Sequence, residues 1–173
     1  MKNIFTRFPK VLVFVLFILT GFQQFSAAQS ITNYTLASSS GTFTALTSPV
    51  SPALSAGTID NGSYNALPIG FDFWYMGIRY TTASASTNGW FTLGANITNT
   101  NGTYDATNNL ATGGENRPVI APLWDDIALT AATNFTYKTT GTAPNRIFTM
   151  QWLSVKWNAV ASASNMSFQA RLY

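Results

Sequence analysis

The feature that most constrains the fold is a period-two alternation near the end of the chain. In the segment 166–172, MSFQARL, the even-numbered residues are apolar and the odd-numbered ones are polar. The segment 146–152, RIFTMQW, places Phe148, Met150 and Trp152 on one face in the same way. Successive side chains of a strand point to opposite faces, so both segments are predicted to be half-buried strands. The pattern breaks over 153–157, where we expect a bend or a bulge.

Other segments also have the composition of strands and turns. LPIGFDFWYMG (67–77) and IRYTTASAS (78–86) predict two strands joined by a turn at Met76–Gly77, and Asn88–Gly89 is typical of a type I′ turn. Pro118 and Pro122 confine the apolar strand RPVIAPLW (117–124) to a sheet edge or bend it. TNFTYKTTG, TNYTLA and GTFTAL predict shorter strands. Since no helical period is sustained, we predict an all-β fold, an antiparallel β-sandwich.

The first 28 residues have a different composition from the rest of the chain. Three basic residues, Lys2, Arg7 and Lys10, precede an apolar run of about twelve residues, and the small residues Ser26-Ala27-Ala28 follow it. A spanning helix needs about twenty apolar residues. The pattern therefore predicts a helical signal peptide over 1–28 rather than a membrane anchor, and hence a secreted or surface-exposed protein.

The remaining chain is electrically neutral, with six basic and six acidic side chains. A balanced charge gives no reason to expect nucleic acid or anionic lipid as a partner, and no other stretch is apolar enough to span a membrane. We predict Ser/Thr-rich strands and loops over 29–66 and the core of the sandwich over 67–173. The polar, glycine-rich stretch 96–116 predicts a long surface loop.

Most catalytic chemistries lack their residues in this sequence. The chain contains no His and no Cys, which excludes Ser-His-Asp and Cys-His mechanisms and the usual zinc sites. No glycine-rich phosphate loop follows a strand and opens a helix. The sequence therefore predicts a protein that is not an enzyme and that requires no cofactor, calcium being the one candidate.

Asp125–Asp126, at the end of RPVIAPLWDDI, is the one close carboxylate pair. Neighbouring side chains of a strand diverge, so the two could act together on a glycosidic bond only in a turn and with a further partner. Calcium takes six to eight oxygen ligands, so these aspartates are candidates for a calcium site, although no D-x-D-x-D-G loop is present. The favoured interpretation is structural: the pair ends a strand and accepts hydrogen bonds from turn amides.

The five tryptophans raise the possibility of sugar stacking, although core packing is the commoner role. Trp152 and Trp124 lie in apolar patterns and are predicted to be core residues. Trp74 has the opposite parity to Phe71 and Phe73, and Trp90 follows a turn. Trp74 and Trp90, together with Asn88 in that turn, are therefore the candidates for an exposed ligand-binding surface.

The order of motifs carries a resemblance: PIGFDFWYMGIRY, ASTNGW, RPVIAPLWDDI, TYKTTGTAPNRIFTMQW and SFQARLY. It resembles the N-terminal β-sandwich module of large secreted Bacteroidetes proteins, which are often exported by the type IX system. It is similar, more loosely, to the NIDO domain of nidogen-type matrix proteins. The resemblance covers about 67–173 and implies a largely non-catalytic extracellular module, from which no catalytic residue carries over.

Two functions remain open on the sequence. The first is an adhesion or recognition module that binds an extracellular glycan or matrix protein. The second is an accessory domain of a larger secreted hydrolase, and an inert spacer is a third alternative. The chain ends inside a predicted strand, so we expect the sandwich to be truncated and further domains to follow in the same polypeptide.

Overall fold

The computed structural model describes residues 32, 34–98, 100, 110, 117–164 and 166–173. The predicted signal peptide lies outside these residues, as does most of the predicted loop 96–116. The chain divides into two compact units, Met1–Thr35 and Leu36–Tyr173. The second unit contains every strand of the described chain. No helix among the described residues is long and apolar enough to cross a membrane.

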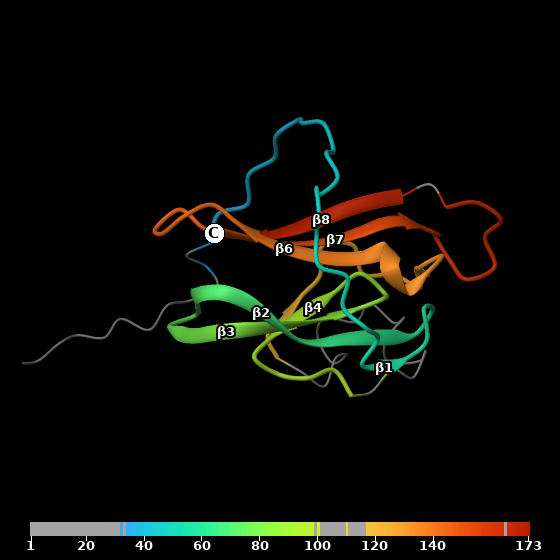
Figure 1. Ribbon diagram of the computed structural model, residues 1–173, viewed down its shortest axis with the longest axis horizontal. Coiled ribbons are helices and arrows are strands. Elements are labelled where there is room, and N and C mark those ends of the chain that lie inside the picture. The colour runs from blue at the N-terminus through green and yellow to red at the C-terminus, as the bar shows by residue number, and fades with distance from the viewer. Residues whose placement is uncertain (1–31, 33, 99, 101–109, 111–116, 165) are drawn as a thin grey trace, which may run out of the picture. The chain divides into compact units, whose positions relative to one another are not determined.

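Two antiparallel sheets form the second unit, and they lie as two layers in Figure 1. The first has the order β1-β2-β3-β4-β5, and the second has the order β6-β7-β8. The strands of the first sheet are β1 (Ala56–Gly57), β2 (Gly62–Tyr75), β3 (Ile78–Ser86), β4 (Phe91–Leu93) and β5 (Val119–Ile120). Those of the second are β6 (Phe135–Thr140), β7 (Ile147–Val155) and β8 (Met166–Leu172), with the short 3-10 turn η3 (Ala132–Asn134) before β6. The predicted antiparallel β-sandwich is therefore confirmed.

The core lies between the two sheets and contains the residues that alternation assigned to it. Phe148, Met150 and Trp152 of β7 are all fully buried. Trp152 stacks on Phe168 of β8 and donates its indole N–H to the carbonyl of Ser86 in the first sheet, at 2.9 Å. A polar atom of the largest core side chain is thus satisfied across the sandwich, which fixes the two layers in register.

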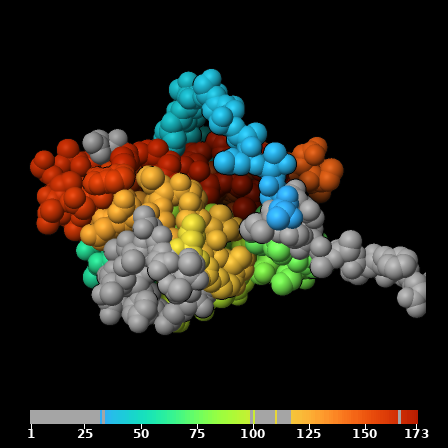
Figure 2. All heavy atoms as spheres, turned by 180° about the vertical axis from the view of Figure 1, so that it is seen from behind, coloured from blue at the N-terminus to red at the C-terminus, as the bar shows by residue number. Residues whose placement is uncertain are grey.

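The polar face of β7 is also buried, which alternation did not predict. Gln151 and Thr149 are 1% and 3% exposed. The segment before β1 crosses this outer face, where Leu46 donates its amide to Gln151 Oε1 and Gln169 Nε2 donates to the carbonyl of Thr44. Figure 2 shows this segment in blue to cyan against the red strands. Further along the segment, Val50 forms an isolated antiparallel bridge with Tyr137 of β6. The strands predicted at TNYTLA and GTFTAL are wrong, because the described residues there form no strand.

The turn predicted at Met76–Gly77 is confirmed, whereas the turn type predicted at Asn88–Gly89 is not. Met76 and Gly77 both have positive φ, 52° and 76°, between the paired residues Tyr75 and Ile78, which is the type I′ geometry. At the other end of β3 a three-residue loop, Thr87 to Gly89, carries positive φ at Gly89 but not at Asn88. Ser86 donates its amide to the carbonyl of Trp90 across that loop. The type I′ turn predicted at Asn88–Gly89 is therefore wrong.

The remaining irregularities were predicted more closely. β5 is only two residues long and lies at the edge of its sheet, as the two flanking prolines require. In β7 the register shifts between Trp152 and Val155, where Ser154 has a φ of 53°. The bulge expected over 153–157 is therefore confirmed.

Candidate functional site

An open cleft of about 850 Å³ lies where β2 bends away from β3. Pro68 pairs with Thr82 and Phe73 pairs with Tyr80, so four residues of β2 stand opposite Thr81 alone. Ile69 is fully buried and Phe71 packs against the core, so the additional residues interrupt the ladder while the strand keeps its inward face. The walls come from three segments: Pro68, Gly70, Phe71 and Asp72 of β2, Thr81 and Thr82 of β3, and Ala143, Pro144 and Arg146 before β7. We call this site the bulge cleft.

Gly70 lies at the centre of the bend. Its φ is 84°, a backbone conformation that costs an L-residue about 1–2 kcal/mol but costs glycine little. A side chain here would also meet Thr139 of β6 at 3.2 Å. Thr139 donates its hydroxyl to the carbonyl of Ile69 at 2.7 Å, which ties the bend to the second sheet. The bulge is thus a fixed feature of the fold.

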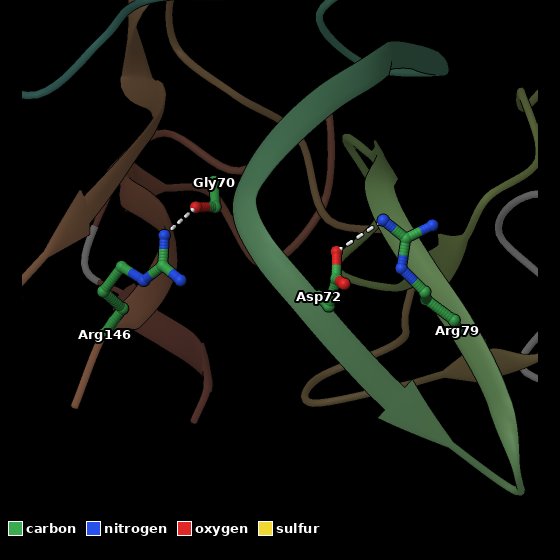
Figure 3. Close-up of polar contacts among 4 residues, drawn as sticks. All are labelled: Gly70, Asp72, Arg79 and Arg146. Atoms are coloured by element: carbon green, nitrogen blue, oxygen red, sulfur yellow. Dashed lines mark hydrogen bonds and ion pairs between the residues drawn. The ribbon is translucent and has the colours of Figure 1, made fainter. Parts of the chain in front are cut away.

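Arg146 forms one wall of the cleft, and Figure 3 shows it beside β2. Its Nη1 donates to the carbonyl of Gly70 at 2.7 Å, and its guanidinium lies 5.7 Å from the centre of the Phe71 ring. The hydrogen bond and the cation–π contact hold the planar group in one orientation. The Nε atom is shielded from solvent and has no hydrogen-bond partner.

On the other side of β2, Asp72 pairs with Arg79 of β3 at 2.7 Å, as Figure 3 also shows. The hydrogen bond from Arg79 lowers the pKa of Asp72, and the charges of Arg79 and Arg146 lower it further. Asp72 is therefore a carboxylate at neutral pH. The two arginines exceed it by one positive charge.

Trp74 continues this outer face. It is 59% exposed and stands directly opposite Arg79 in the β2–β3 ladder. Side chains of such cross-strand partners lie side by side on one face of the sheet. The exposed indole, the Asp72–Arg79 pair and the bulge cleft therefore form one continuous surface.

Trp90 and Asn88 do not lie on that surface. Trp90 is 2% exposed and packs against Trp124, with ring centres 5.5 Å apart, and against Ile97. The loop at Leu123 folds back onto the turn, where Leu123 donates its amide to the carbonyl of Gly89, and this covers both residues. The exposed position predicted for Trp90 is therefore wrong, and Asn88 is completely buried. Ile97, at the start of the predicted surface loop, is buried with them.

Asn88 joins several polar residues at the start of β2. Its Nδ2 donates to Asn61 Oδ1 at 3.0 Å, and its carbonyl accepts the amide of Asp125 at 3.4 Å. Asn61 donates in turn to Asp60. We call this group, with Asp126, the acidic loop end. The hairpin thus brings Asn88 close to the aspartates that the sequence singled out.

The two predicted calcium ligands behave differently at the acidic loop end. Asp125 accepts the backbone amide of Asp126 at 2.8 Å, a local turn bond of the kind expected for a structural role. Asp126 acts on Asp60: burial raises the pKa of Asp60, and the negative charge of Asp126 raises it further. Among the described residues no group of three or more acidic side chains gathers around a common point.

The bulge cleft was missed by the sequence predictions, although one signal pointed to it. Pro68 and Gly70 interrupt the strand pattern of β2, and a proline or glycine inside a strand often marks a bulge. Nothing in the sequence near Arg146 indicates that it folds back onto Gly70, because that contact joins residues 76 positions apart.

Comparison with known proteins gives one match. The chain matches the NIDO-related family over residues 33–173. The protein belongs to this family. The looser of the two resemblances drawn from the motifs is thereby supported, and an extracellular type of module follows from it. Neither the curated proteins nor the solved structures gave a match.

Proposed function

We propose that this NIDO-related domain is a non-catalytic extracellular recognition module that binds a glycan or a matrix protein on its outer β2–β3 face. The observation that carries the proposal is the continuous surface of Trp74, the Asp72–Arg79 pair and the bulge cleft. An exposed aromatic plane beside paired charged groups supplies both contact area and hydrogen-bond direction. The resemblance to modules of secreted Bacteroidetes proteins suits the same setting.

The surface also favours binding over chemistry. Its one carboxylate, Asp72, is held by Arg79 and has its pKa lowered, whereas a general acid needs a raised pKa. The nearest strand hydroxyls, those of Thr81 and Thr82, have no histidine to activate them in this sequence. Positioned polar groups around a cleft, without an activated member, are what a binding site requires.

The test is binding of the full chain to an array of polysaccharides and matrix proteins. We expect specific binding that falls about tenfold or more in Trp74→Ala, since one stacking contact contributes about 1–3 kcal/mol in comparable recognition. Trp157→Ala is the matched control, because Trp157 is 50% exposed but lies in the loop after β7. Binding that both variants reduce equally, or no binding by a folded chain, would contradict the proposal.

A further inference from the structure

The charges of the bulge cleft indicate what kind of ligand it fits. Arg146 forms no ion pair with any described residue, and its protein contacts are the carbonyl of Gly70 and the ring of Phe71. A guanidinium has five N–H donors; the Nε–H is shielded and one Nη1 hydrogen is used by Gly70, so the hydrogens that remain for a ligand are those at the Nη1 and Nη2 end. It lies half-buried in the cleft wall, where an unbalanced cation has lost part of its hydration.

The partner that suits this group best is a carboxylate. Asp72 does not neutralise Arg146, because its carboxylate is already bound to Arg79 at 2.7 Å. A planar guanidinium fixed by its neighbours presents two parallel donors, which match the two oxygens of a carboxylate. A bound carboxylate would also cancel the excess positive charge of the site. The bent strand, held at Gly70, keeps the arginine in place before the ligand arrives.

The same surface favours a saccharide over a peptide. Peptides often add as a strand to an exposed sheet edge. β1 pairs with β2 only at Gly62 and Ser63, but at the cleft the carbonyls of Ile69 and Gly70 already accept hydrogen bonds from Thr139 and Arg146, and the β2–β3 ladder is interrupted. The remaining groups are an exposed indole, two threonine side chains and an ion pair. These suit the apolar face and the hydroxyls of a sugar ring.

We propose that the bulge cleft binds an acidic glycan, with Arg146 bound to a sugar carboxylate and Trp74 against a neighbouring ring. This inference rests on the proposed function and names its ligand class. It makes Arg146 the residue that separates acidic from neutral saccharides, while Trp74 contributes to the binding of both.

The experiment uses the full chain and three probes: oligogalacturonates, the same oligosaccharides with their carboxyl groups reduced to alcohols, and poly-L-glutamate. We expect the oligogalacturonates to bind at least about tenfold more tightly than their reduced forms, with an affinity that falls as salt is added. Arg146→Gln should remove that preference, so that the oligogalacturonates and their reduced forms bind with similar affinity. Arg146→Lys should retain part of it, since lysine keeps the charge without the planar fork.

Arg171→Gln is the matched control, because it removes one positive charge from the exposed side of β8. Thermal unfolding of each variant shows whether it is folded, and the lysine variant keeps the test valid if the glutamine variant is not folded.

Equal binding of acidic and reduced forms would overturn the inference while leaving the proposed function intact. Binding of poly-L-glutamate alone would assign the cleft to acidic protein. A loss of affinity in Arg171→Gln equal to that in Arg146→Gln would show that only net charge matters and would overturn the inference. No binding of any of the three probes by a folded chain would also overturn it, whereas the array of polysaccharides and matrix proteins decides the proposed function.

Discussion

Two polar regions lie along β2, and they shift the pKa of an aspartate in opposite directions. At the acidic loop end, just before the strand, Asp60 is close to Asp126 and its pKa is raised. At the bulge cleft, Asp72 lies between two arginines and its pKa is lowered. The first region concentrates negative charge, and the second has more positive charge than it neutralises. Residues 29–173, whose basic and acidic side chains balance, therefore present two regions of opposite charge about ten residues apart in sequence.

The two regions also differ in how tightly they are built. The acidic loop end is closed by backbone packing: a side chain at Gly89 would collide with the carbonyl oxygen of Leu123. The bulge cleft is open, and a side chain at Gly70 would meet only the Thr139 side chain. Closed packing suits a structural anchor, whereas an open site with fixed polar groups suits ligand binding.

The largest predicted effect tests that difference in packing. Gly89→Ala combines a φ of 78° with a backbone collision, so we expect it to lower the free energy of unfolding by about 3 kcal/mol or more. Gly70→Ala has a similar φ but a contact that can relax, and we expect a loss of about 1–3 kcal/mol. Chemical denaturation of each variant gives these values.

Gly77→Ala is the control for both variants. Its φ is 76° and no atom lies within 4 Å of the added Cβ, so it reports the conformational cost alone. If Gly89→Ala were no worse than Gly77→Ala, the loop at Leu123 would not be packed against the turn in solution.

These glycines also show how far the sequence could predict the fold. Alternation in 146–152 and 166–172 was sufficient to predict strands and core residues, because burial on one face leaves a local pattern. Asn88–Gly89 predicted a turn correctly but not its type or its burial, since both depend on the loop at Leu123, more than thirty positions along the chain. Local patterns do not contain such contacts.

The candidate site was less predictable for the same reason. Trp74 could be predicted as exposed from its parity alone, and it is 59% exposed. The exposed position of Trp90 was wrong because a distant segment covers it. The bulge cleft requires additional residues in β2, relative to β3, together with Arg146 from the turn before β7, and neither leaves a periodic signal. A sequence thus indicates which residues face outward more readily than which of them meet.

The second prediction concerns the calcium hypothesis at the acidic loop end. If Asp126 holds Ca²⁺ with nearby oxygens, calcium at several millimolar should stabilise the chain by about 1–2 kcal/mol, given the dissociation constants of about 0.1–1 mM of extracellular modules. Thermal unfolding with calcium and then with a chelator measures this. Asp126→Asn should abolish the stabilisation, whereas Asp72→Asn in the bulge cleft should retain it. A chain indifferent to calcium would reject the hypothesis and leave the aspartates with their turn role.

The smallest predicted effect separates the two carboxylates by pH. The raised pKa of Asp60 means that its contribution to stability is fully present below the unfolded pKa of about 3.8 and is lost as the pH rises through the folded value. The lowered pKa of Asp72 means that its contribution is present above about 3.8 and is lost as the pH falls through the folded value. Asp60 is half-buried and Asp72 lies at the surface, where solvent screens its interactions, so we expect both effects to be small. The free energy of unfolding can be measured with urea between about pH 2.5 and 7, a range that includes the usual pKa of an aspartate. As the pH rises, Asp60→Asn should become more stable relative to the wild type. Asp72→Asn should be less stable than the wild type at neutral pH and should converge with it in acid, and parallel curves for the two variants would mean that the regions do not differ in charge as the structure indicates.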